Sequence, residues 1–231
     1  EYNITSFVAI DDYSRNKKYY QNCFEYRQNK IKGLDRNMKT LFITGGSGTG
    51  KSTYAKMIAS QKGYTAYVSS GGKNPLDNYK GEECIILDDT RSSSWHLTDF
   101  LKLTDNNTDS LVGCRYYNKS IAECKYLIVT SVKSIDEFYE NATREDNEPK
   151  IQLFRRFPML ISLTADKMII SAYNEQIQRY TPQIEAINPV SALFNPVNAK
   201  KMCDDFATAM GLKILSKPTP TLTEVHDDMP F

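Results

Sequence analysis

The stretch from Phe42 to Lys56, FITGGSGTGKSTYAK, decides the fold of this chain. Its apolar start predicts a buried strand, and a helix is expected from Lys51 to Gln61. Between them, Gly45 to Ser52 match the pattern GxxxxGK[ST]. Glycines are needed in such a loop because its backbone N–H groups must wrap closely around phosphate oxygens. The stretch therefore predicts a strand, a phosphate-binding loop and a helix whose first amides face the phosphates.

Each polar residue of this loop has an expected role. Lys51 would neutralise charge on the β- and γ-phosphates of ATP, and Ser52 would offer its hydroxyl to Mg²⁺. The predicted ATP-binding residues are Gly45, Gly46, Ser47, Gly48, Thr49, Gly50, Lys51, Ser52 and Thr53.

A second catalytic element is expected where another buried strand ends in two acids. The segment ECIILDD places Asp88 and Asp89 after four apolar residues. One carboxylate, Asp88, would face the metal ion together with Ser52, and Asp89 would face the attacking water. Two acids at a strand end are also common in solvated turns, but the apolar lead-in favours the catalytic interpretation.

Two further polar pairs complete the predicted site. The strand KYLIVTS ends in Thr130 and Ser131, either of which would contact the γ-phosphate or water. Arg155 and Arg156 precede the apolar strand MLISLT, a position where an arginine would reach the ATP of a neighbouring subunit. A structural arginine pair is the alternative.

Apolar strands alternate with helices through the middle of the chain, which predicts a parallel sheet covered on both faces. We expect an α/β fold of the AAA+-like P-loop ATPase type with a five-stranded parallel sheet. The predicted strands are 41–44, 64–69, 83–89, 125–131 and 159–164, and a helix is expected around WHLTDFLKLTD. The segment MIISAY is a further candidate strand.

The chain divides into four predicted parts. Residues 1–38 form a small helical oligomerisation module, and residues 39–175 form the ATPase domain. Residues 176–217 are expected as a C-terminal helical extension that contains a helix after Asn195, and residues 218–231 as a flexible acidic tail.

Composition excludes several classes of protein. The formal net charge of +1 gives no bulk signature of nucleic-acid binding, and there is no apolar run long enough to span a membrane. Five cysteines without a CxxC pair argue against a disulfide framework or a zinc site and favour a cytosolic protein with reduced thiols. Because the chain starts at Glu1, we expect an upstream domain.

An aromatic and basic element follows the two acids. We expect residues 112–117 and 120–124 to pair as a hairpin whose tip contacts DNA, because cations bind backbone phosphates and aromatic rings stack on bases. An ordinary hairpin with solvated charges is the alternative. The residues at its tip are Arg115, Tyr116, Tyr117, Asn118 and Lys119.

The order of these parts resembles a superfamily 3 helicase, and more narrowly the helicase half of rolling-circle replication initiators (Rep proteins) of small circular single-stranded DNA viruses and bacterial plasmids. The resemblance covers roughly residues 33–164. It implies a homo-hexameric ring that uses ATP and Mg²⁺ to translocate 3′→5′ on single-stranded DNA, in the cytoplasm of a bacterial host or in a nucleus. It also implies that a nicking activity, if present, lies upstream of Glu1.

One position departs from this family. An asparagine usually follows the Thr-Ser pair, but Val132 stands there, so the sensor role would fall to Thr130 or Ser131. Two other functions stay open. One is a P-loop ATPase that remodels protein without DNA, and the other is a nucleotide kinase.

The chain ends in PTPTLTEVHDDMPF, an acidic stretch with an apolar tip. This ending is similar to the C-terminal tip of bacterial single-stranded-DNA-binding proteins, which implies docking to a host replication factor. Self-inhibition in the DNA channel, or a plain solvated tail, are the alternatives. The tip residues are Asp227, Asp228, Met229, Pro230 and Phe231.

Overall fold

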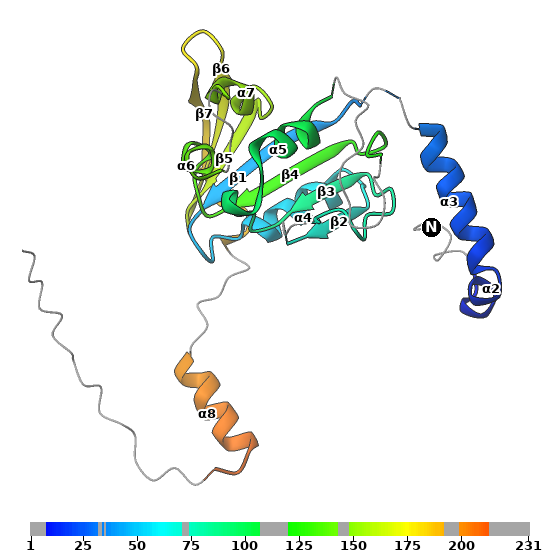
Figure 1. Ribbon diagram of the computed structural model, residues 1–231. Helices are drawn as coiled ribbons and strands as arrows, with labels where there is room; N and C mark the ends of the chain where they lie inside the picture. Colours follow the sequence, from blue (N-terminus) through cyan, green and yellow to red (C-terminus); the bar gives the residue numbers. More distant parts are fainter. Residues whose placement is uncertain are drawn as a thin grey trace, which may run out of the picture. The chain divides into compact units, whose positions relative to one another are not determined.

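The computed structural model describes residues 8–31, 34, 36–70, 74–106, 120–142, 148–191 and 199–212. It divides into two compact units, residues 1–193 and residues 194–231. The first unit contains one sheet of seven strands in the order β2-β3-β4-β1-β5-β6-β7 (Figure 1). The strands are β1 (Lys39–Gly45), β2 (Ala66–Ser69), β3 (Cys84–Leu87), β4 (Tyr126–Ser131), β5 (Met159–Leu163), β6 (Lys167–Asn174) and β7 (Arg179–Ile187).

The five strands β2, β3, β4, β1 and β5 are all parallel, as the sequence predicts. The predicted total of five strands is nevertheless wrong, because β6 and β7 add an antiparallel extension beside β5. The segment MIISAY does form a strand, β6. Strand β7 escaped prediction because RYTPQIEAI holds Pro182 and has a mostly exposed burial pattern, which an edge strand tolerates and a central strand does not.

Strand β7 also corrects the predicted domain boundaries. The boundary at residue 175 falls in the turn between β6 and β7, and these two strands pair from Asn174–Arg179 to Lys167–Ile187. Part of the expected helical extension is therefore sheet. Its expected helix is present as α8 (Ala199–Ala209), in the second unit.

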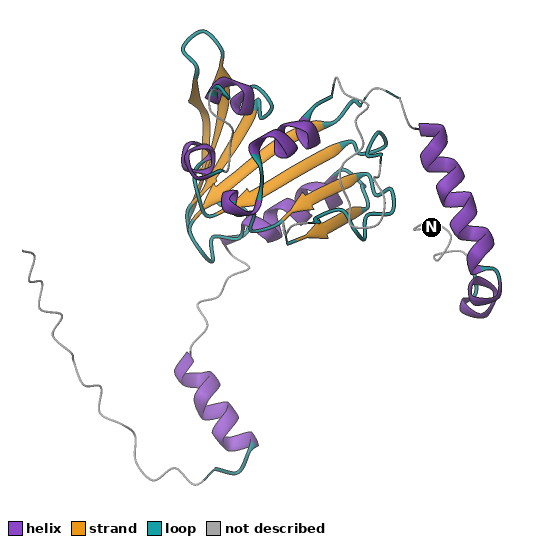
Figure 2. Cartoon of the chain, in the orientation of Figure 1, coloured by secondary structure: helices purple, strands orange, loops and turns teal. Residues whose placement is uncertain are grey.

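Helices cover both faces of the parallel strands (Figure 2). On one face α4 (Lys51–Gln61) places Ala55 and Ala59 against Leu41 and Ile43 of β1. On the other face lie α5 (Leu97–Thr104), α6 (Ile135–Asn141) and α7 (Lys150–Phe154), where Phe42 contacts a cluster of buried aromatic rings. Successive side chains of β1 thus enter opposite core layers. This two-sided burial holds the ends of the strands in a fixed register.

The amino-terminal segment is helical, with α2 (Ile10–Arg15) and α3 (Lys17–Ile31). Phe24 is buried, and Arg27 forms an ion pair with Glu123 at 2.6 Å. Whether these helices mediate oligomerisation stays a prediction.

The predicted hairpin is wrong in the half that the structure describes. Residues 120–125 form a turn, in which the Cys124 amide donates to the Ile121 carbonyl at 2.9 Å, rather than a strand. Ile121 and Cys124 are both buried, so the segment is fixed by side-chain packing and not by strand pairing. The other half, residues 112–117, lies outside the described residues.

Four of the five cysteines lie among the described residues. Cys84 and Cys124 are buried and Cys23 and Cys203 are exposed, all four as free thiols. Within the described part of the chain, none of the helices combines the length and apolar character that crossing a membrane requires.

Candidate active site

The candidate site lies at the carboxyl edge of the parallel strands, where β1, β3 and β4 end. Ile43 pairs with Thr130 and Thr44 with Ser131, so the ends of β1 and β4 are level with each other. Strand β3 ends one residue before Asp88. Crevices at this edge are where open α/β sheets bind ligands. The sheet therefore brings together residues that lie up to about 85 positions apart in the sequence. They are so far apart because parallel strands must be joined by long crossover connections.

The phosphate loop leaves β1 through Gly45, whose φ of +153° and surroundings exclude a side chain. A Cβ at this position would lie 2.2 Å from the carbonyl oxygen of Leu163 in β5. Gly48 and Gly50 have φ values of +74° and +88°, in the left-handed region that favours glycine. The glycines of the motif are therefore required by close packing at one end of the loop and by backbone conformation at the other.

Lys51, the first residue of α4, is buried and turned back toward the loop. Its Nζ donates to the carbonyl oxygens of Gly45 at 2.8 Å and Gly46 at 2.7 Å. Burial lowers the pKa of this amine, while the charges of Asp89 and Asp88 act in the opposite direction. A buried cation held at the mouth of a glycine loop is suited to pairing with phosphate oxygens.

Asp88 connects three elements of the site. Its Oδ1 accepts hydrogen bonds from Ser52 Oγ at 2.6 Å and from Thr130 Oγ1 at 2.7 Å. Hydroxyl and carboxylate oxygens are ligands that Mg²⁺ uses, typically one or two together with waters and substrate phosphates. The described residues hold no group of three or more His, Cys, Asp or Glu that could hold a metal ion. A Mg²⁺ at this point would take its further ligands from water or a phosphate substrate. Ser52 and Asp88 are the residues that would hold it.

Asp89 differs from Asp88 in exposure and backbone conformation. It is exposed, and its φ of +48° is unusual for a residue other than glycine, although Asp and Asn tolerate this region best. Its amide donates to Thr130 Oγ1 at 2.9 Å, which fixes the turn after β3. This turn directs Asp88 toward Ser52 and leaves the Asp89 carboxylate free to meet a solvent molecule.

The two residues at the end of β4 are not equivalent. Thr130 is fully buried and contacts both acids through the bonds just described. Ser131 donates instead to the Thr90 carbonyl oxygen at 2.9 Å and accepts from the Lys133 amide. Val132, at the position of the usual asparagine, is 47% exposed. Of the two sensor candidates, Thr130 is therefore the one whose hydroxyl contacts the Asp88 carboxylate.

The two predicted arginines also separate. Arg156 makes a bidentate ion pair with Asp105, with distances of 2.7 and 2.6 Å, and both side chains are largely buried. Arg155 is exposed and has neither an ion pair nor a side-chain hydrogen bond to any described residue. The structural role that the sequence left open thus fits Arg156, and Arg155 remains the candidate for reaching a neighbour.

Arg155 lies at the opposite edge of the sheet from the phosphate loop. It lines a cavity with Lys39, the first residue of β1, whereas the loop begins at Gly45, the last residue. At about 3.3 Å per residue, the seven-residue strand spans about 20 Å. An arginine side chain does not bridge that distance, so Arg155 cannot serve the phosphate site of its own chain.

Asn188, just after β7, is a site residue that the sequence analysis missed. Its buried side-chain amide donates to the Thr49 carbonyl of the phosphate loop at 3.0 Å and to the Thr164 carbonyl after β5 at 2.8 Å. Its Oδ1 accepts from the Val190 amide. No local pattern marks this residue, because its partners become neighbours only through the antiparallel extension.

We predict that Asn188→Ala weakens ATP binding about tenfold, which corresponds to about 1.4 kcal/mol. The change removes the side-chain donor to two partly buried carbonyl groups, and the Thr49 carbonyl belongs to the loop itself. A fluorescent-nucleotide titration measures the effect. Asn174→Ala, which removes only the two contacts of Asn174 with the amides of Gln176 and Ile177 in the turn between β6 and β7, is the matched control and should bind ATP normally. Equal affinity in both variants would contradict a role for Asn188 in shaping the loop.

The remaining predicted site residues lie outside the described residues. These are the hairpin residues Arg115, Tyr116, Tyr117, Asn118 and Lys119 and the tail residues Asp227, Asp228, Met229, Pro230 and Phe231. Their roles stay predictions.

Part of this chain is similar to known proteins. Residues 41–133 match the family model described as RNA helicase. The matched span runs from β1 to just beyond β4, so it includes Lys51, Asp88 and Thr130 and stops before Arg155. It covers less than half of the chain.

The chain is also 47% identical, over 174 residues, to a "Replication protein" of Onion yellows phytoplasma (strain OY-M). The aligned part is 75% of this chain and 46% of that protein, so this chain spans about half the length of its relative. The two matches show that this chain is similar to an RNA helicase family over part of its length and to about half of a replication protein.

Among solved structures, the flagellar accessory protein FlaH from Methanocaldococcus jannaschii overlaps 70% of this chain and 94% of its own length, at 15% identity and a TM-score of 0.29. A TM-score this low bears on neither fold nor function.

Proposed function

We propose that this chain is the ATP-driven motor of a replication protein and that it unwinds DNA by moving along a single strand. The observation that carries the proposal is the meeting of Lys51, Ser52, Asp88 and Thr130 at one edge of the sheet. The family match over residues 41–133 and the similarity to a replication protein support helicase function.

The residues divide the chemistry among them. Lys51 and the amides at the start of α4 bind the phosphates, and Ser52 and Asp88 are the residues that would hold Mg²⁺. A bound Mg²⁺ would offset negative charge on the phosphates during hydrolysis. Asp89 orients the attacking water and accepts its proton, and Thr130 holds both acids in register.

The position of Arg155 is the observation that supports assembly of the chain into a ring. Because Arg155 cannot reach the phosphate site of its own chain, it would instead contact the ATP of a neighbouring copy, where a cation stabilises negative charge in the transition state. We propose a homo-hexamer that moves 3′→5′ on single-stranded DNA in rolling-circle replication. The C-terminal tip would recruit a host replication factor.

The proposal is tested by measuring phosphate release from ATP and Mg²⁺ with and without single-stranded DNA. We expect turnover that rises severalfold on addition of DNA and is absent in Lys51→Ala. ATP hydrolysis that does not respond to DNA would instead favour an ATPase that remodels protein. Phosphoryl transfer to a nucleoside monophosphate would favour a nucleotide kinase.

A further inference from the structure

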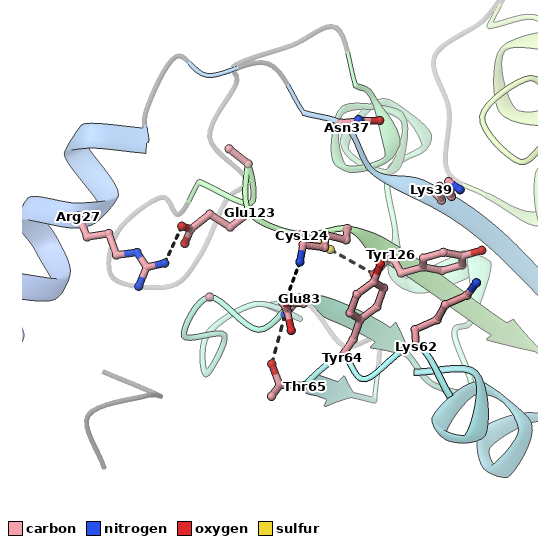
Figure 3. Close-up of a pocket in the computed structure, with 13 residues that line it drawn as sticks. Arg27, Asn37, Lys39, Lys62, Tyr64, Thr65, Glu83, Glu123, Cys124 and Tyr126 are labelled. Carbon is pink, nitrogen blue, oxygen red and sulfur yellow. Dashed lines mark hydrogen bonds and ion pairs between the residues drawn. The ribbon is translucent and has the colours of Figure 1, made fainter. Parts of the chain in front are cut away.

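A cavity of about 790 Å³ opens at the amino edge of the sheet, at the end opposite the phosphate loop (Figure 3). Lys39 comes from the start of β1, Lys62 and Tyr64 from the segment after α4, and Lys125 and Tyr126 from the start of β4. We call these five residues the amino-edge groove. A second cavity of about 590 Å³, which Arg155 lines, lies next to it, because both are lined by Asn37, Lys39 and Tyr126.

The groove carries an excess of positive charge, although the chain as a whole is nearly neutral. Four cationic and two acidic side chains line the larger cavity. Each acid is already paired: Glu123 with Arg27 at 2.6 Å and Glu83 with Lys125 at 2.5 Å. Lys39 and Lys62 have no ion-pair partner among the described residues. The groove therefore presents two uncompensated cations to an anionic ligand.

Two tyrosine rings lie among these cations. The centroids of Tyr64 and Tyr126 are 6.4 Å apart with the rings tilted by 42°, and Lys125 Nζ lies 5.2 Å from the Tyr64 ring centroid. In Figure 3 the Tyr126 ring lies between the side chains of Lys39 and Lys62. Aromatic faces beside lysines are the combination by which proteins bind single-stranded nucleic acid, because bases stack on the rings and phosphates contact the cations.

The groove also lies at the root of the segment predicted to contact DNA. Residues 107–119 lie outside the described residues, but the chain on both sides of them is fixed. Asn106 exchanges hydrogen bonds with Met38 at 2.9 and 2.8 Å, and Asn106 lines the second cavity. On the other side, the Ser120 amide donates a hydrogen bond to Gln28 Oε1 at 3.1 Å. Residues 122–126, which follow it, line the first cavity.

We propose that the amino-edge groove binds single-stranded DNA, with phosphates on Lys39 and Lys62 and a base against Tyr64 or Tyr126. The inference rests on the proposed function, because it concerns the strand along which the motor would move. It adds a contact that is separate from the predicted hairpin tip.

The first test measures how binding of a fluorescent oligo-dT depends on salt. The double variant Lys39→Gln/Lys62→Gln should bind about tenfold more weakly at low salt. Its plot of log affinity against log salt should be shallower by about 1.4, since each phosphate contact on a single strand contributes about 0.7. The matched control, Lys56→Gln/Lys167→Gln, removes the same charge from exposed positions outside the groove and should bind as the unmodified chain does.

The second test separates stacking from charge. Tyr126→Leu should weaken oligo-dT binding about fivefold or more with an unchanged salt slope, because it removes a ring and no cation. Photo-cross-linking of the unmodified chain to 4-thiothymidine DNA should label the tryptic peptides 63–73 or 126–133, which contain the two tyrosines.

The outcomes distinguish this inference from the proposed function. Loss of binding in the groove variants, with ATP hydrolysis in the absence of DNA unchanged, supports the groove. DNA-stimulated hydrolysis that is equal in the groove variants and the control, with no label on either peptide, overturns the groove and leaves the motor intact. Normal DNA binding with altered size on gel filtration would show that the groove contacts another copy of the chain, and would also overturn it. A chain that binds oligo-dT in the groove but hydrolyses no ATP would refute only the motor.

Discussion

Replacing Arg155 with alanine should lower the rate of ATP hydrolysis by a factor of about 10³ or more while leaving the fold unchanged. Arginines that complete a neighbour's site contribute about 10³ to 10⁵ in turnover. Arg155 is exposed and has neither an ion pair nor a side-chain hydrogen bond to any described residue, so its removal costs the fold little. Phosphate release and thermal unfolding, measured on the same sample, check both halves of the prediction.

Arg156→Ala is the matched control because it changes the neighbouring arginine. It breaks the largely buried bidentate pair with Asp105 and should lower the free energy of unfolding by about 1.5–3 kcal/mol. We thus expect Arg155→Ala to lose turnover and Arg156→Ala to lose stability. The opposite pattern would reassign the two residues.

Mixing variants tests whether Arg155 acts on a neighbour. Arg155→Ala subunits keep their phosphate loop, and Lys51→Ala subunits keep Arg155. When the two inactive variants are mixed, a site formed by one of each is complete, so activity should return in part. If mixing restores nothing although both variants assemble normally, Arg155 does not act across a subunit boundary.

The second large effect is expected at the carboxylates. Asp89→Asn should lower turnover by a factor of about 10² to 10⁴, the usual contribution of a general base, with ATP binding retained. Asparagine suits this test because it tolerates the φ of +48° that Asp89 adopts, so the turn after β3 should persist. Lys51→Ala should instead lose nucleotide binding together with turnover.

A nucleotide titration and a single-turnover measurement separate these two effects. Asp99→Asn on α5 removes an exposed carboxylate elsewhere and should leave both quantities unchanged. Full turnover in Asp89→Asn would exclude Asp89 as the base. Normal ATP binding in Lys51→Ala would place the nucleotide somewhere other than this loop.

The sequence by itself determined the parallel half of the sheet and the chemistry at its edge. Runs of three or four apolar residues marked each of the five parallel strands. The central strands β1, β3 and β4 are buried on both faces, which favours apolar residues at successive positions. The glycine loop and the two acids could also be predicted from the sequence. Binding a phosphate closely requires glycines, and binding a metal ion requires oxygen ligands, so few residue types fit these positions. The strand β7 gave no such signal, because an edge strand can be polar and contain Pro182.

Only the tertiary structure decided which residue of an adjacent, chemically similar pair has which role. Arg155 and Arg156 are adjacent and chemically identical, yet the position of Asp105 engages one and leaves the other exposed. Thr130 and Ser131 separate in the same way, because successive side chains of a strand point to opposite faces and only one faces Asp88. The contact of Asn188 with the phosphate loop and the grouping of Lys39, Lys62, Tyr64 and Tyr126 depend on long-range packing, which no local pattern encodes.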